Sequence, residues 1–202
     1  MKPSTNNPSD TNKLFPVFLK LENLPLLIVG GGKIALEKLT AVLENSPQTH
    51  IKLVALNISE AMRALAKDHP NIHLTEKPFG VEDLEGIIIV IVAVNDPGQS
   101  LQIYQLVKEH GRLVNVADMP DLCDFYMASI VRKGNLKIAV STNGKSPTIA
   151  KRLKEVFSEL LPDELEDVLN NMQKIRNNLS GDFSNKVRTL NTITETLVRK
   201  QD

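Results

Sequence analysis

The sequence has 202 residues, 42% hydrophobic and 24% charged, which is typical of a globular protein and excludes a disordered, collagen-like or disulfide-scaffold chain. Its 24 basic residues equal its 24 acidic ones, and only 4% of residues are aromatic, so composition favours neither a nucleic-acid nor a membrane partner. The single cysteine, Cys123, excludes an internal disulfide and any CxxC metal site.

Residues 1–13 are polar and rich in Asn, Ser, Thr and Pro, and we interpret them as a disordered tail. They lack the apolar stretch of a secretory signal. The longest purely apolar run, residues 87–94, is far shorter than the roughly 20 residues that a transmembrane helix needs. These observations predict a cytoplasmic protein.

From residue 24 onward, short apolar runs alternate with amphipathic stretches, which is typical of βαβ units. Strands are predicted at residues 24–29, 51–56, 72–75, 87–94 and 113–116. Helices are predicted at residues 33–45, 60–68 (with Ser59 as the N-cap) and 100–110. This order predicts a doubly wound, Rossmann-like parallel sheet in an α/β domain over residues 14–116.

The rest of the chain has a different pattern. Two strands are predicted at residues 130–131 and 136–140, which assigns residues 117–145 to a small α+β segment. Ser146 and Pro147 are residue types preferred at the N-cap and the first position of a helix. Apolar residues then recur at helical spacing, so residues 146–202 are predicted to form a helical C-terminal domain.

Residues 30–35, Gly-Gly-Gly-Lys-Ile-Ala, match the dinucleotide-binding pattern G-x-G-x-x-G/A between a predicted strand and a predicted helix. In that pattern Gly30 permits a tight turn, Gly32 lets the backbone approach a pyrophosphate, and Ala35 permits close helix–strand packing. The pyrophosphate then lies against the helix N-terminus. The motif predicts a dinucleotide cofactor, and a glycine turn without a ligand is the alternative.

The acidic residue that usually follows the second strand of such a fold and binds the ribose hydroxyls is missing. That strand is followed by Asn57, and the nearest acidic residue is Glu60. Asn57 can still hydrogen-bond a ribose, and no Arg is close enough in sequence to indicate a 2′-phosphate. The residues alone therefore do not separate NAD from NADP.

The neutral net charge hides a local asymmetry. Residues 125–154 contain seven basic residues and no acidic one, whereas residues 155–167 contain six acidic residues and no basic one. A basic segment beside a helix N-terminus suits a polyanionic ligand. A solvated face neutralised by the acidic stretch is an equally good interpretation.

Several stretches now point to one family: FPVFLKL, LLIVGGGKIALEKL, AVND, LVNVADMPDLCDF, SIVRKGNLKIAVSTNGKSPTIAKRLKE and LLP, in this order. With them the chain resembles the precorrin-2 dehydrogenase family, the NAD-dependent module of sirohaem synthesis, over roughly residues 14–165. The resemblance implies oxidation of the tetrapyrrole precorrin-2 to sirohydrochlorin with NAD. In some members the same module also inserts ferrous iron.

The resemblance also implies roles for individual residues. In the Asn-Val-Ala-Asp stretch, Asp118 is implied as the catalytic carboxylate. The residues implied to bind NAD follow the first, second and fourth strands: Gly30, Gly31, Gly32, Lys33, Ile34, Leu56, Asn57, Ala93, Asn95 and Asp96. The residues predicted to bind the tetrapyrrole carboxylates belong to the basic segment: Lys145, Ser146, Lys151 and Arg152. No resident metal site is predicted.

The family is a homodimer that exchanges strands of its middle segment, which implies a dimerising role for residues 117 to about 140. Two other functions stay open. One is a non-catalytic, dinucleotide-sensing Rossmann dimer, slightly favoured by the missing ribose acid and the scarcity of histidines. The other is a protein that only inserts ferrous iron, and nothing in the sequence decides whether this member chelates iron.

Overall fold

The computed structural model describes residues 14–179 and 183–194, and the chain divides into two units at residues 127 and 128. The division falls inside the segment 117–145, which the sequence pattern separates from the Rossmann-like domain. The predicted tail at residues 1–13 lies outside the described residues.

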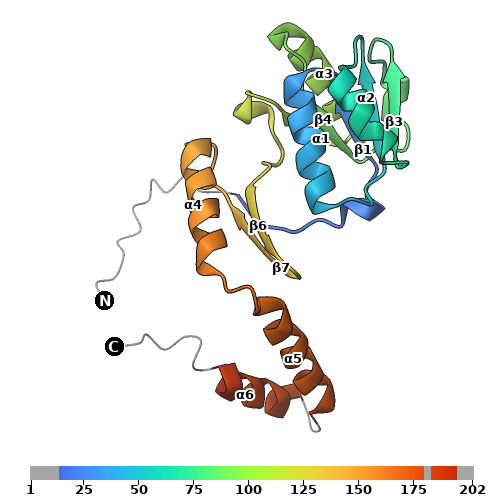
Figure 1. Cartoon of the computed structure of the whole chain (residues 1–202). Helices are drawn as coiled ribbons and strands as arrows, with labels where there is room; N and C mark the ends of the chain where they lie inside the picture. Colours follow the sequence, from blue (N-terminus) through green and yellow to red (C-terminus); the bar gives the residue numbers. More distant parts are fainter. Residues whose placement is uncertain (1–13, 180–182, 195–202) are drawn as a thin grey trace. The chain divides into compact units, whose positions relative to one another are not determined.

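A five-stranded parallel sheet forms the centre of the first unit (Figure 1). The order of its strands is β3-β2-β1-β4-β5. The strands are β1 (Leu26–Val29), β2 (Ile51–Ala55), β3 (Ile72–Glu76), β4 (Ile89–Val92) and β5 (Leu113–Val116). All residues of β1 and β4 are buried, as expected for central strands covered on both faces. The predicted doubly wound parallel sheet is confirmed.

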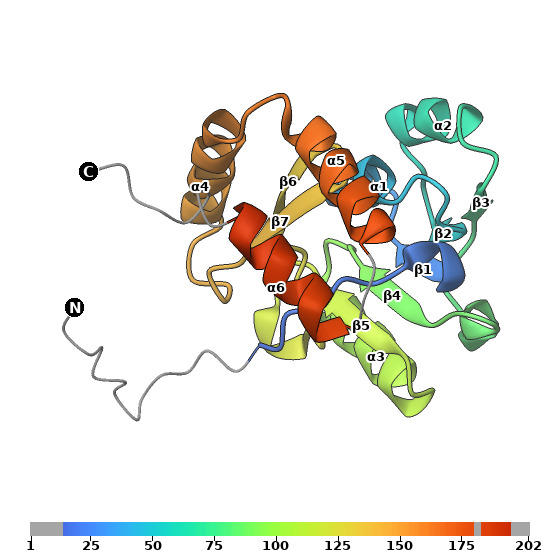
Figure 2. The ribbon, with the colours of Figure 1, turned by 90° about the horizontal axis from the view of Figure 1, so that it is seen from below.

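Helices cover both faces of this sheet (Figure 2). The elements are α1 (Lys33–Asn45) and α2 (Glu60–Lys67) on one face, and α3 (Pro97–Glu109) with the 3₁₀ turn η2 (Val81–Leu84) on the other. Because side chains alternate along a strand, Leu26 and Ile28 pack toward α1, whereas Leu27 and Val29 pack toward α3. Two shorter 3₁₀ turns are η1 (Leu21–Asn23) and η3 (Pro120–Leu122).

One helix start differs from the predictions, and one predicted N-cap lacks its side-chain hydrogen bond. The helix predicted from residue 100 begins at Pro97, because the Asp96 carboxylate accepts the Gln99 N–H at 2.9 Å and caps the helix there. Ser59 does occupy the N-cap position of α2, but its side chain makes no capping hydrogen bond. The Asp-Pro pair at residues 96–97 was the signal for the earlier start.

In the second unit, β6 (Ser129–Lys133) and β7 (Leu136–Val140) pair as an antiparallel hairpin, against which α4 (Pro147–Leu160) packs. The two-residue turn begins at Gly134, whose φ of 54° is a left-handed conformation that glycine adopts without strain.

The remaining helices of the second unit are α5 (Leu165–Asn178) and α6 (Phe183–Thr194). One acidic residue at the start of α5 binds the hairpin turn: Glu166 Oε2 accepts the Asn135 N–H at 2.7 Å, and Glu166 Oε1 accepts the Asn135 side-chain amide at 2.6 Å. No helix within the described ranges has the length and apolar character needed to cross a bilayer.

Candidate functional site

The carboxyl ends of four strands lie level with one another at one edge of the sheet. Val29 of β1 pairs with Val54 of β2 and with Val92 of β4, which in turn pairs with Val116 of β5. Each of these strands continues into a loop that carries predicted site residues. Ligands of open α/β sheets bind at this edge, at the point where the strand order reverses, here between β1 and β4.

The glycine loop after β1 fits tightly between the loops of its two neighbours. A Cβ atom on Gly30 would overlap the Ala93 carbonyl, and the φ of Gly30 is 129°, a conformation open to glycine alone. A Cβ atom on Gly31 would overlap the Asn57 carbonyl, a constraint that the sequence motif did not reveal. In contrast, a Cβ atom on Gly32 would meet no atom within 4 Å, so this glycine faces open space.

Backbone hydrogen bonds hold these loops together. The Gly30 N–H donates to the Val54 carbonyl oxygen at 2.9 Å, and the Ala93 N–H donates to the Val29 carbonyl oxygen at 2.8 Å. The Ser59 N–H after β2 also donates to the Gly31 carbonyl oxygen, so these bonds connect the loops after β1, β2 and β4 to one another or to the neighbouring strand. The residues predicted for the cofactor therefore lie on a rigid frame.

The N-terminus of α1 is arranged to receive an anion. No side chain caps this helix, so the N–H groups of its first turn have no capping partner, and the space beside Gly32 at the N-cap is open. The helix dipole adds partial positive charge there, and the exposed Lys33 adds a full one. A dinucleotide pyrophosphate fits this position.

The loop after β2 carries features that fit the adenosine end of a dinucleotide. Leu56 is 60% exposed, although it is a large apolar residue, and Asn57 beside it is also exposed. The hydroxyl of Ser59 is buried and has no hydrogen-bond partner among the described residues. An apolar face, an amide and an orphaned hydroxyl are groups that a base and a ribose can use.

An acidic residue that sequence reasoning missed lies at the same edge. Glu76 ends β3, and its backbone pairs with Ala55 of β2. Its Oε1 accepts the Ile58 N–H at 3.0 Å, and its Oε2 lies 2.6 Å from Nη2 of Arg63. The hydrogen bond from Ile58 and the contact with Arg63 hold the pKa of Glu76 below its ordinary value. Only the register of β2 and β3 reveals this placement.

The loop after β4 contributes Asn95 and Asp96, which are both exposed. The carboxylate of Asp96 already serves as the N-cap of α3, because it accepts the Gln99 N–H. Asp96 therefore has a structural role at this edge, beside the cofactor-binding role predicted for it.

Asp118 lies in a tight turn directly after β5 and is exposed. The turn is closed by the Met119 N–H, which donates to the Val116 carbonyl oxygen at 3.3 Å. The φ of Asp118 is 60°, a left-handed conformation that costs an L-residue roughly 1–2 kcal/mol. Such strain persists where the surrounding structure imposes it, and it is frequent at functional sites.

The segment behind Asp118 is anchored to the sheet. The buried Asn115 donates its side-chain amide to the Phe125 carbonyl oxygen at 2.8 Å, and the Val116 N–H donates to Sγ of Cys123 at 3.3 Å. Burial raises the pKa of the Cys123 thiol, which keeps it protonated and structural. These contacts anchor the segment that follows the Asp118 turn to β5.

The residues predicted to bind the tetrapyrrole lie together within the second unit, at the start of α4. Lys145 and Lys151 are exposed, and Ser146 Oγ accepts the Ile149 N–H at 3.2 Å as the helix cap. Arg152 Nη1 lies 2.7 Å from Glu155 Oε2, so this guanidinium is paired within its own helix.

Part of the basic segment is neutralised by the acidic stretch that follows it. Besides the pair of Arg152 and Glu155, Lys133 forms an ion pair with Asp163. Lys133 and Arg152 are therefore paired with acidic residues, whereas Lys145 and Lys151 are exposed to solvent.

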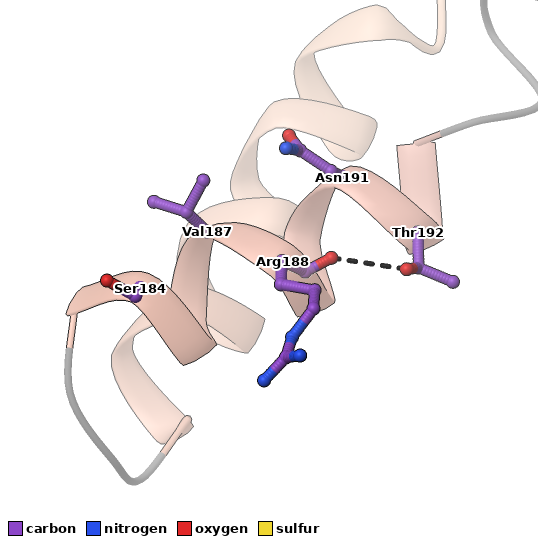
Figure 3. Close-up of a pocket in the computed structure, with 5 residues that line it drawn as sticks. All are labelled: Ser184, Val187, Arg188, Asn191 and Thr192. Carbon is purple, nitrogen blue, oxygen red and sulfur yellow. Dashed lines mark hydrogen bonds between the residues drawn. The ribbon is translucent and has the colours of Figure 1, made fainter.

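A pocket of about 420 Å³ lies outside this site, along α6 (Figure 3). It is lined by Ser184, Val187, Arg188, Asn191 and Thr192. All five come from one helix, and Thr192 Oγ1 donates to the Arg188 carbonyl oxygen at 3.2 Å as part of the helix itself. None of them is a predicted site residue.

Known protein families match both units. The model of a family described as NAD(P)-binding matches residues 17–129, and the model described as the central domain of a sirohaem biosynthesis protein matches residues 133–156.

Similar proteins include the siroheme synthases of Neisseria meningitidis serogroup C (strain 053442), 33% identical over 154 residues, and of Mannheimia succiniciproducens, 32% identical over 182 residues. These alignments cover 76% and 90% of this chain but 32% and 36% of the relatives. The chain thus spans about a third of the length of the curated relatives it matches.

A solved structure titled "SirC, precorrin-2 dehydrogenase" superposes with a TM-score of 0.69 and 26% identity, covering 93% of each chain. These findings confirm the Rossmann-like fold class and the predicted NAD cofactor.

Proposed function

The chain belongs to the NAD(P)-binding family of sirohaem biosynthesis proteins, and we propose that it oxidises precorrin-2 to sirohydrochlorin with NAD. The observation that carries the proposal is the joint presence, at one sheet edge, of an uncapped helix N-terminus and the strained, exposed carboxylate of Asp118. The similarity to a precorrin-2 dehydrogenase over 93% of the chain supports the substrate.

The loops at the sheet edge carry the residues that would hold NAD. The N–H groups at the start of α1 bind the pyrophosphate beside Gly32, and Leu56 and Asn57 contact the adenosine. Ala93 and Asn95 line the other side of the crevice, after β4. When bound there, NAD supplies a hydride acceptor for the oxidation.

Oxidation of precorrin-2 removes a hydride and a proton from the ring, so the site needs a base. We assign this role to Asp118, whose carboxylate accepts the proton while the hydride leaves. Lys145, Lys151 and Arg152 bind the substrate's carboxylates, together with Ser146. For Arg152 this requires exchange of Glu155 for a substrate carboxylate.

We also propose that a second copy of the chain covers an apolar stripe on α4. The stripe consists of Ile149, Leu153, Val156, Phe157 and Leu160, which are 36–71% exposed. Among the described residues of this unit, only Val131 and Ala150 are buried apolar side chains. Two buried apolar side chains are few for a unit with a two-stranded hairpin and the helices α4, α5 and α6, and a twofold dimer would supply more buried surface by pairing identical stripes.

The dimer is tested by sedimentation of the wild type and of Leu160→Asp. We expect a dimer for the wild type and a monomer for Leu160→Asp, because the introduced charge would be buried without a partner. Glu159→Gln, a neighbouring exposed position, is the matched control and should stay dimeric. A monomeric wild type would contradict the proposal and indicate that the stripe packs within the chain.

The activity is tested by incubating the protein with precorrin-2 and NAD, with and without ferrous iron, while following the tetrapyrrole and NADH spectra. Formation of sirohydrochlorin and NADH in equal amounts supports the proposal. Iron insertion without NADH formation would indicate a chelatase, in which iron is a substrate. Cofactor binding without either reaction would indicate the dinucleotide sensor.

A further inference from the structure

Glu76 brings a carboxylate to the position where the cofactor site lacks one. The acid that follows the second strand in related folds is absent here, but β3 runs parallel to β2 and ends beside it, with Glu76 level with Ala55. The Glu76 side chain accepts the N–H of Ile58, which lies in the loop after β2 and directly follows Asn57. The negative charge at the adenosine end of the proposed site is therefore supplied by β3 and not by β2.

We propose that Glu76 and Arg63 make this site select NAD over NADP. The inference rests on the proposed cofactor site at the ends of β1 and β2. It assigns to these two residues a role in specificity that sequence position alone does not indicate.

The first part of the argument is electrostatic. The ribose 2′-phosphate of NADP carries between one and two negative charges at neutral pH, and a carboxylate beside Asn57 repels it. Both the Ile58 N–H and Arg63 stabilise the ionised form of Glu76, so the repulsion is present at neutral pH. The side chain is 44% exposed, and solvent limits the effect to about tenfold in affinity.

The second part concerns the cation. Arg is the residue type that accommodates a 2′-phosphate in NADP-binding folds, and Arg63 on α2 is the Arg that the fold brings to this loop. Its Nη2 is already 2.6 Å from Glu76 Oε2. The carboxylate therefore both repels the phosphate and occupies the guanidinium that would bind it.

The test compares the dissociation constants of NAD and NADP, measured by calorimetry, in the wild type and in Glu76→Gln. Glutamine keeps an oxygen acceptor for the Ile58 N–H, removes the charge and releases Arg63. We expect the preference for NAD to fall about tenfold, mainly through tighter NADP binding. In the double variant Glu76→Gln/Arg63→Ala, much of the gain in NADP affinity should be lost.

Two controls separate the charge from other effects. Glu109→Gln removes the same charge at the C-terminus of α3, at the opposite edge of the sheet, and should leave the preference unchanged. Glu76→Asp keeps a carboxylate on a shorter side chain and should retain a preference for NAD.

Three results would overturn this inference but leave the proposed function standing. They are a wild type with no preference for NAD over NADP, an unchanged preference in Glu76→Gln, and a loss of preference in Glu76→Asp or Glu109→Gln as large as that in Glu76→Gln. If the wild type binds neither cofactor, the proposed cofactor site itself is wrong.

Discussion

The carbonyl oxygen of Gly31 accepts the N–H of Ser59 at 3.0 Å, which joins the glycine loop to the start of α2. This bond requires the two loops to approach so closely that a side chain on Gly31 would overlap the Asn57 carbonyl. The close approach leaves Gly32, the next residue, as the point of the loop that faces open space. Gly30 and Gly31 are therefore required for packing, whereas Gly32 leaves space for a ligand. Substitutions at these positions distinguish the two roles.

Gly32→Asp should abolish NAD binding without destabilising the protein. Gly32 is the N-cap residue of α1 and has extended backbone angles, so an Asp there can cap the helix and add roughly 0.3–1 kcal/mol of stability. The same carboxylate would repel the pyrophosphate. Calorimetry measures the affinity and thermal unfolding the stability.

Gly31→Ala is the contrasting variant and should lower the free energy of unfolding by about 1–3 kcal/mol, because its Cβ has no room. Unchanged NAD affinity in a folded Gly32→Asp protein would refute the pyrophosphate position.

Local signals in the sequence were sufficient for the glycine loop and for the start of α4. The glycine motif and the Ser146–Pro147 cap are each recognised from a few adjacent residues, although the contacts that demand glycine at positions 30 and 31 come from the Ala93 and Asn57 carbonyls, far away in sequence. Glu76 could not be found in this way, since its partner Ile58 is 18 residues away and meets it only through the register of β2 and β3. The strained φ of Asp118 likewise depends on the turn that the fold imposes.

Asp83 should make the stability of the first unit sensitive to acid. Its side chain is 1% exposed; burial raises its pKa, but hydrogen bonds from Lys52, the Gly80 N–H and Lys77 outweigh burial and hold the pKa below the ordinary value. A carboxyl group with a lowered folded-state pKa contributes stability above its unfolded pKa of about 4, and this contribution is lost as the pH falls through the folded-state value.

Asp83→Asn should therefore destabilise the protein at pH 7 and weaken the decrease in stability below about pH 4. Denaturant unfolding across this pH range measures both effects. Glu85→Gln, an exposed neighbour, is the control and should change neither. A parallel pH dependence in the wild type and Asp83→Asn would contradict the assignment.

Replacing Lys145 and Lys151 together by Gln should weaken precorrin-2 binding and its salt dependence while leaving NAD affinity intact. Both ammonium groups are exposed at the start of α4, where they attract carboxylates through solvent that salt screens. Arg152→Gln should have a smaller effect, because Arg152 is already paired with Glu155.

The matched control for these lysines is Lys174→Gln/Arg176→Gln, which removes the same charge from the exposed surface of α5. Substrate affinity is measured by fluorescence or absorbance titration at two salt concentrations. An equal loss of substrate affinity in both double variants would show that only the net charge of the protein matters. A parallel loss of NAD affinity and substrate affinity would indicate a folding defect.

Asp118→Asn is the most direct test of the mechanism. Asn tolerates the left-handed φ of this turn at least as well as Asp, so thermal stability should be unchanged. The amide cannot accept the proton, and kcat should fall about 10²–10⁴-fold while NAD affinity persists. Asp121→Asn, which changes an exposed carboxylate in the following 3₁₀ turn, is the control and should keep wild-type rates.

Precorrin-2 oxidation and iron insertion are assayed separately on Asp118→Asn. Loss of both activities indicates one shared site, and loss of one activity assigns Asp118 to that step. Wild-type rates in both assays would remove Asp118 from the mechanism.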